Sequence, residues 1–189
     1  KGAYSTDGVT WRDVSMPANR NWYTVTYGNG KFVALVYSGS TGAYSSDGIN
    51  WTEMNLIYSR TWQSVTYGNA TFVAVTSSSN DGIYSTDGIS WTRMVMPANR
   101  DWYSVTYGNG KFVAVAYGSD KGAYSTDGIS WTEFRLPASS SWYDVTYGDG
   151  KFVAGAWNSA NGAYWKSAAQ VTYSISDTTI TANSDVLME

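Results

Sequence analysis

Residues Tyr124–Trp131 read YSTDGISW, and the same frame occurs three more times in the chain. It reads YSTDGVTW from Tyr4, YSSDGINW from Tyr44 and YSTDGISW from Tyr84, so one copy begins every 40 residues. A fifth start, GAYW at Gly162, keeps this spacing and then departs from it. A fixed period of about 20–50 residues is the signature of repeat architectures. The repeat therefore decides the fold.

The centre of each copy predicts a tight turn. Aspartate accepts hydrogen bonds from nearby backbone amides, and the glycine after it adopts a positive φ at little cost. Four copies at identical spacing indicate an architectural role, so loss of one carboxylate should lower stability by roughly 1 kcal/mol and leave ligand affinity unchanged. The predicted structural turn residues are Asp7, Asp47, Asp87 and Asp127.

One full period from Trp22 predicts four antiparallel strands. WYTVTYG and KFVALVY are rich in β-branched and aromatic residues, and the Asn29-Gly30 pair between them is a strong hairpin signal. Glycine interrupts the apolar pattern too often for a helix. The predicted strands lie near 22–27, 31–37, 42–46 and 50–55, and recur every 40 residues.

A repeating unit of about 40 residues with four strands is typical of a β-propeller blade. The first two strands of each period are almost continuously apolar, as in YTVTY and FVALVY, which indicates burial on both faces. Inner strands of a blade lie between neighbouring blades and meet this condition. The predicted fold class is all-β, a β-propeller of four-stranded antiparallel blades.

The predicted propeller covers residues 1–166. It divides into a half-blade at 2–16, blades at 22–57, 62–97 and 102–137, and a half-blade at 142–165. The two half-blades could pair and close a four-bladed ring, but GAYW at 162–165 would compete with residues 2–5. The alternative is a fragment of a larger ring. Residues 167–189 are interpreted as the start of a neighbouring β module or an assembly segment.

The repeated octamer resembles the Asp box, or BNR repeat, of sialidase-like β-propellers, whose pattern is Ser-x-Asp-x-Gly-x-x-Trp. One residue is missing between Asp and Gly in every copy, so the sequence is a shortened relative. Together with W-x-x-V-T-Y-G-N-G-K-F-V-A, it resembles propeller repeats of phage tail and fibre proteins and of bacterial surface proteins. The resemblance implies a structural turn. The matching residues are Ser5, Asp7, Gly8 and Trp11; Ser45, Asp47, Gly48 and Trp51; Ser85, Asp87, Gly88 and Trp91; and Ser125, Asp127, Gly128 and Trp131.

Composition excludes several classes of site. The net charge of −3 gives no electrostatic footprint for nucleic acid, and no apolar run approaches the roughly 18 residues of a membrane span. The sequence has no Cys and no His, which excludes disulfides, thiolate or imidazole zinc sites, and Ser-His or Cys-His nucleophile pairs. No metal site and no cofactor is predicted.

The loop before each first strand carries the candidate ligand-binding residues. In a propeller this loop and the loop between the second and third strands lie on one face. The prediction is a ring of arginine and aromatic side chains at the mouth of the central channel, which binds a ligand or, alternatively, joins neighbouring blades. An arginine can hold a carboxylate, and aromatic rings can stack on sugars. The residues are Arg20, Arg60, Arg100, Trp22, Trp62, Trp102, Trp142, Tyr37, Tyr117 and Trp157.

The predicted function is a non-catalytic binding module for a cell-surface glycan or receptor, within a larger assembly outside the cell or on a virion. Further blades or modules of a parent protein are possible partners. One alternative is a structural or protein-docking scaffold. The second is a sialidase-like glycoside hydrolase, which needs a carboxylate pair. Glu53 and Glu133 fall on the outer strand, which leaves Asp81, Asp101 and Asp120 as candidate acids, so no enzymatic activity is expected.

Overall fold

The computed structural model describes residues 1–157 and 162–166, so the prediction for 167–189 lies outside the described residues. These residues form fifteen β-strands and no helix, which confirms the all-β fold class. Accordingly, the described part of the chain contains no helix that could span a membrane.

The strands follow one another as blades in chain order. An N-terminal hairpin holds β1 (Gly2–Tyr4) and β2 (Arg12–Val14). Blade 1 comprises β3 (Trp22–Gly28), β4 (Lys31–Val36), β5 (Ser38–Ser45) and the first part of β6 (Thr52–Gly68). Blade 2 comprises the second part of β6, β7 (Thr71–Thr76), β8 (Ser79–Ser85) and the first part of β9 (Thr92–Gly108). Blade 3 comprises the second part of β9, β10 (Lys111–Tyr117), β11 (Ser119–Ser125) and β12 (Thr132–Ser140), and blade 4 comprises β13 (Trp142–Gly148), β14 (Lys151–Ala156) and β15 (Gly162–Lys166).

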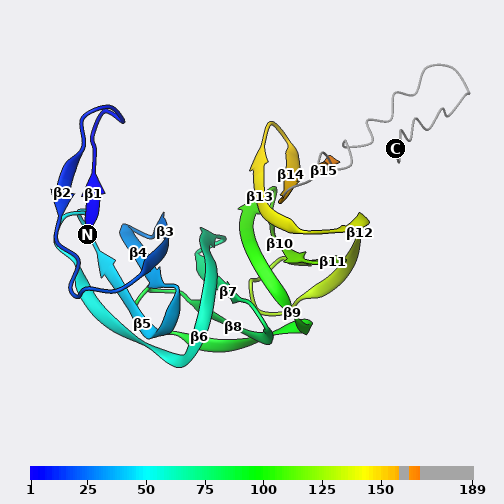
Figure 1. Cartoon of the computed structure of the whole chain (residues 1–189), viewed down its shortest axis with the longest axis horizontal. Helices are drawn as coiled ribbons and strands as arrows, with labels where there is room; N and C mark the ends of the chain where they lie inside the picture. The colour runs from blue at the N-terminus through cyan, green and yellow to red at the C-terminus, as the bar shows by residue number, and fades with distance from the viewer. Residues whose placement is uncertain (158–161, 167–189) are drawn as a thin grey trace, which may run out of the picture.

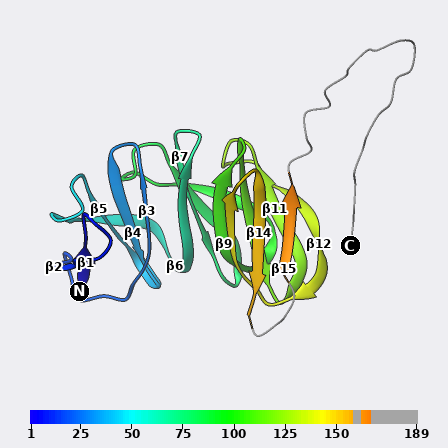
Figure 2. The same ribbon diagram turned by 90° about the horizontal axis from the view of Figure 1, so that it is seen from above.

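Strands β6 and β9 each belong to two blades. Each runs without interruption from the outer edge of one blade to the inner edge of the next, so β3 to β12 form one antiparallel sheet of ten strands. Figure 1 shows the blades as an open arc, and Figure 2 shows them side by side from above. The outer and inner strands predicted separately from the sequence are therefore joined.

The hairpin between β3 and β4 has the predicted turn. Asn29 and Gly30 both have positive φ, 46° and 71°, as a two-residue turn with this twist requires. The ladder continues from Gly28 opposite Lys31 to Trp22 opposite Val36, with a register shift near Trp22. The same turn recurs in the next three blades, at residues 69–70, 109–110 and 149–150.

The hydrophobic core lies between blades. Val33 and Leu35 of β4 pack in one cluster with Trp62 and Phe72 of blade 2. Equivalent clusters join blade 2 to blade 3 and blade 3 to blade 4. The inner strands of blades 2 and 3 are therefore largely buried on both faces, as their continuous apolar sequences predict, whereas β3 at the first end of the arc is partly exposed.

The ends of the arc are not paired with each other in the described residues. β15 pairs with β14, from Gly162 opposite Gly155 to Lys166 opposite Lys151, and β1 pairs with β2. The GAYW copy thus takes the third-strand place in blade 4, where the N-terminal hairpin would have to pair. Closure of a four-bladed ring is not confirmed.

Candidate functional site

Each Ser-x-Asp-Gly turn is closed by its own side chains. In blade 2 the Ser85 hydroxyl donates to Asp87 Oδ1 at 2.9 Å and accepts from the Gly88 amide at 2.8 Å. The same carboxylate oxygen accepts from the backbone amides of Ile89 and Ser90, both at 2.8 Å. Equivalent hydrogen bonds form around Asp7, Asp47 and Asp127.

These hydrogen bonds hold the carboxylates ionised. Burial raises the pKa of the Asp87 carboxyl, but hydrogen bonds from the Ser90 and Ile89 amides outweigh it and lower the pKa to about 2. A carboxyl whose pKa is lowered on folding stabilises the protein at pH values above the ordinary aspartate pKa of about 3.9. That contribution is lost as the pH falls towards 2.

Replacing Asp87 by alanine should lower the free energy of unfolding by roughly 1–3 kcal/mol, since hydrogen bonds to the charged carboxylate are lost. Asp87→Asn is the matched control, because its side-chain oxygen can still accept from both amides, and it should retain most of the stability. Urea denaturation measures both variants. Equal losses in the two variants would contradict the hydrogen-bonding role of the turn.

The repeated tryptophans before the inner strands belong to the core. Trp62, Trp102 and Trp142 have no exposed surface, and the indole N–H of each donates to a backbone carbonyl. Trp22 is half-buried, and its N–H donates to the Ala18 carbonyl at 3.2 Å. This differs from the expected ring of tryptophans at the mouth, because each of the three buried indoles fills the gap between its own blade and the preceding one.

The three repeated arginines pair with carboxylates of different blades. Arg20 lies 3.4 Å from Glu53 in blade 1, and Arg100 lies 3.0 Å from Glu133 in blade 3. Arg60 pairs with Asp81 in blade 2 at 2.5 Å. The structure therefore does not gather the guanidinium groups into one cluster. Arg60 and Arg100 lie where β6 and β9 cross from the outer edge of one blade to the inner edge of the next, opposite Gly39 and Ser79.

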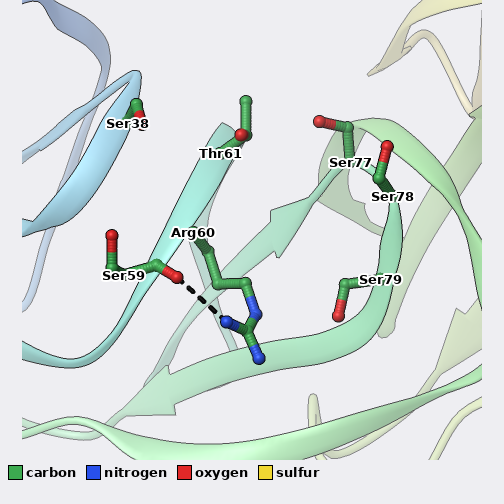
Figure 3. A pocket seen from close by; sticks show the side chains of 7 residues that line it. All are labelled: Ser38, Ser59, Arg60, Thr61, Ser77, Ser78 and Ser79. Carbon is green, nitrogen blue, oxygen red and sulfur yellow. Dashed lines mark hydrogen bonds between the residues drawn. The ribbon is translucent and has the colours of Figure 1, made fainter.

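A polar pocket of about 360 Å³ opens beside Arg60 (Figure 3). Arg60 donates to the Ser59 carbonyl at 2.9 Å and lies over the Tyr58 ring. Hydrogen bonds from Arg60 are the main cause that lowers the pKa of Asp81, which also pairs with Arg93. Arg60 thus shares one carboxylate with Arg93, so these three side chains together keep one net positive charge. The pocket is lined by Ser38, Ser59, Arg60, Thr61, Ser77, Ser78 and Ser79.

A second pocket, of about 290 Å³, lies where the four inner strands β3, β6, β9 and β13 converge. We call it the axial pocket. Every blade contributes the two residues that follow its repeated tryptophan. Its lining consists of Tyr23, Thr24, Gln63, Ser64, Tyr103, Ser104, Tyr143 and Asp144.

Aromatic rings surround the axial pocket. Trp157 lies 5.5 Å from Tyr143, Tyr143 lies 5.4 Å from Tyr103, and Tyr103 stacks on Tyr117 at 4.8 Å between centroids. Tyr23 packs against Tyr37 at 5.0 Å. We call these six residues the aromatic surface. Four of them are at least 40% exposed, namely Tyr23, Tyr37, Tyr143 and Trp157.

Two tyrosines of the aromatic surface, from blades 1 and 4, act on each other electrostatically. The hydroxyl of Tyr143, followed by burial, raises the pKa of Tyr23 to about 12. Burial, followed by the charge of Asp101, raises the pKa of Tyr103. These phenols therefore stay neutral at physiological pH and can both donate and accept hydrogen bonds.

Blades 2 and 4 break the symmetry of the axial pocket. In blade 2, Gln63 stands where the other blades have tyrosine, and its amide donates to Ser77 at 3.1 Å. In blade 4, Asp144 replaces a hydroxyl residue and accepts from Ser104 at 2.7 Å. The pocket thus has one polar side and one carboxylate within an aromatic frame.

Tyr37, Tyr117 and Trp157 were predicted at this face, and the structure brings them to the aromatic surface. Tyr23, Tyr103 and Tyr143 were missed. Alternation along a strand could have found them, because the neighbour of a residue directed into the core faces the opposite side.

The candidate acids occupy separate places. Asp101 accepts from Ser78, and Asp120 lies 3.3 Å from Arg135, while Asp81 is held by Arg60. Within residues 1–157 and 162–166, no cluster of three or more potential metal ligands occurs.

No family model and no curated protein matches the chain. Solved structures do. Virginiamycin B lyase from Staphylococcus aureus has a TM-score of 0.75 and 18% identity over 97% of this chain and 62% of the lyase. A streptogramin B lyase has a TM-score of 0.73 and 15% identity, over 91% of this chain and 57% of the lyase. YCF48 bound to D1 peptide has a TM-score of 0.60 and 16% identity, over 83% of this chain and 53% of YCF48.

These similar structures support a β-propeller-type fold for the chain. At 15–18% identity, the likeness concerns the fold alone. The chain spans less than two thirds of the length of each of these proteins.

Proposed function

We propose that the chain is a carbohydrate-binding module that holds an uncharged part of a cell-surface glycan on its aromatic surface, outside the cell or on a virion. The aromatic surface around the axial pocket carries this proposal. The face of an aromatic ring is partly negative and attracts the polarised C–H groups of a sugar ring. Binding sites typically combine such rings with a few polar groups that fix orientation.

The polar groups of the pocket favour an uncharged ligand. Asp144 is the one charged residue in the lining, and Gln63 offers an amide. Both can hydrogen-bond sugar hydroxyls, whereas a carboxylate sugar would meet the negative charge of Asp144. Arg20 and Arg100 each already pair with a glutamate, which points the same way.

Replacing Trp157 or Tyr143 by alanine should weaken glycan binding about tenfold or more, because each removes one ring of the platform. Tyr164→Ala is the matched control: its side chain is 70% exposed in the same blade and lies outside the aromatic surface. A glycan array identifies the ligand, and titration calorimetry compares the variants.

Unchanged affinity in Trp157→Ala and Tyr143→Ala would refute the proposed site. Binding that depends on Arg60 and weakens with added salt would move the site to the pocket beside Arg60 and imply an acidic sugar. Capture of a peptide with no glycan bound would favour a protein-docking scaffold, the type of contact that YCF48 makes with D1 peptide.

Lyase activity has less support. A catalytically inactive variant of the Staphylococcus aureus lyase carries alanine in place of a histidine, and the 189 residues of this chain contain no histidine. The likeness to that enzyme therefore does not extend to this residue.

A further inference from the structure

The first blade exposes positions that every later blade buries. Val25 of β3 is 62% exposed, whereas its repeat equivalents Val65, Val105 and Val145 are 4–5% exposed. Each buried equivalent packs with residues of the preceding blade. Blade 1 therefore presents an interblade surface without its neighbour.

A tyrosine of each blade covers a glycine of the blade before it. A Cβ built on Gly28, Gly68 or Gly108 would lie 1.9–2.0 Å from Cγ of the tyrosine on the next blade, so only glycine fits. This tyrosine–glycine contact is missing at both ends of the arc. Tyr27 is 57% exposed, and nothing lies within 4 Å of the corresponding position on Gly148.

The last blade exposes the complementary surface. Val153 of β14 is 46% exposed, whereas its equivalents Val33 and Val73 are fully buried. The turns at Gly88 and Gly128 cover these two valines, with 3.0 and 2.7 Å to the position of an added Cβ. Val153 is therefore the surface on which the turn of a following blade would pack.

Polar contacts between blades follow the same series. The backbone amide of the inner-strand valine donates to a hydroxyl of the preceding blade: Val65 to Thr24 at 3.2 Å, Val105 to Ser64 at 3.3 Å, and Val145 to Ser104 at 3.2 Å. At the first end of the arc, the Val25 amide has the place of these donors. At the last end, Asp144 has the place of the hydroxyl residues, and its carboxylate can accept the hydrogen bond from such an amide.

We propose that a second copy of this chain closes the arc, with blade 1 of each copy packed against blade 4 of the other. Tyr27 then covers Gly148 of the second copy, and Val25 enters an interblade core. The interface continues one that occurs three times within the chain. Both ends of the arc face the same side in Figure 1, so two copies can close a ring through identical head-to-tail contacts.

Ring closure also requires a strand exchange. The residues GAY occur in β1 at 2–4 and in β15 at 162–164. Both GAY segments occupy the third-strand position of the repeat. The hairpin β1–β2 precedes blade 1, so it must take the place of β15 on β14 of the second copy. This supplies the fourth strand that blade 4 lacks among the described residues.

A disulfide pair tests this exchange. Ala34 pairs with Ala43 in blade 1, and Ala114 pairs with Ala123 in blade 3, so Ala154 should face Ala3 of the second copy. Directly opposed residues have Cα atoms about 4.5–5.5 Å apart, within the range of a disulfide. The chain has no cysteine, so Ala3→Cys with Ala154→Cys introduces the only thiols.

Oxidation of the double variant should give a reducible species with twice the mass of one chain, absent in either single variant. Gly148→Ala in the same background should reduce its yield at least tenfold, because Tyr27 can no longer seat. Light scattering on the wild-type chain, which should show a dimer, checks the result without cysteines.

A cross-linked monomer would overturn the proposal, since it would show that the hairpin reaches β14 of its own chain. A ladder of higher species would also overturn it, by showing an open head-to-tail polymer. So would a wild-type chain that is monomeric in light scattering together with a double variant that forms no cross-linked dimer. None of these readouts uses a glycan, so the outcome is independent of the proposed function.

Discussion

Replacing Trp102 by alanine should lower the free energy of unfolding by roughly 3–5 kcal/mol, the usual cost of removing a fully buried large aromatic side chain. Trp102 has no exposed surface. It packs in one cluster with Val73 and Val75 of blade 2 and Phe112 of blade 3. The substitution leaves a cavity between two blades and also removes the donor to the Ala98 carbonyl.

The control is Trp157→Ala, which removes an indole that is 63% exposed. It should change stability by no more than about 0.5 kcal/mol, as substitutions at exposed positions usually do. Urea denaturation followed by circular dichroism measures both. Similar losses for the two variants would show that the Trp102 cluster does not hold blades 2 and 3 together.

Replacing Gly68 by alanine should destabilise the protein by roughly 1–3 kcal/mol through overpacking. The added methyl carbon would lie 1.9 Å from Cγ of Tyr107, which the side chain cannot avoid by moving its far end. Tyr107 is itself held against Phe112, with 4.7 Å between ring centroids. The substitution therefore forces blades 2 and 3 apart.

Gly148→Ala is the matched control, because it makes the same change at the same repeat position with nothing within 4 Å. Measured at a dilution that keeps the chain monomeric, it should leave stability nearly unchanged. Adding Tyr107→Ala to Gly68→Ala should cost less than the sum of the single effects, since the clash is relieved. Additive effects would rule out the Tyr107 contact as the cause.

Local signals in the sequence predicted most of the strands. The pair Asn29-Gly30 specifies its hairpin by itself, and β3 begins at Trp22 as expected. The joining of outer and inner strands in β6 was not predicted. The sequence LIYSR between them carries neither a clear strand pattern nor a turn signal, and of these five residues only Arg60 pairs with β5, opposite Gly39.

The site was predicted less completely than the fold. The position of Tyr37, Tyr117 and Trp157 was predicted from the loop between the second and third strands, which carries them to this face. The partner of Arg100 did not, because Glu133 lies 33 residues further along the chain and meets it only after the blade has folded. The repeated position of Trp102 gave a wrong prediction, because a large apolar residue at the start of a strand can lie in the core between blades as well as at the mouth of the central channel.

The uninterrupted course of β6 and β9 has a mechanical consequence. A hinge needs a few residues whose backbone dihedral angles can change without loss of structure around them. The backbone that links blades 1, 2 and 3 is itself strand, although the register with β5 and β8 shifts at both crossings, whereas blade 4 follows a residue outside the strands, Ser141. The first three blades should thus deform together as one elastic unit, and bending should concentrate at Ser141.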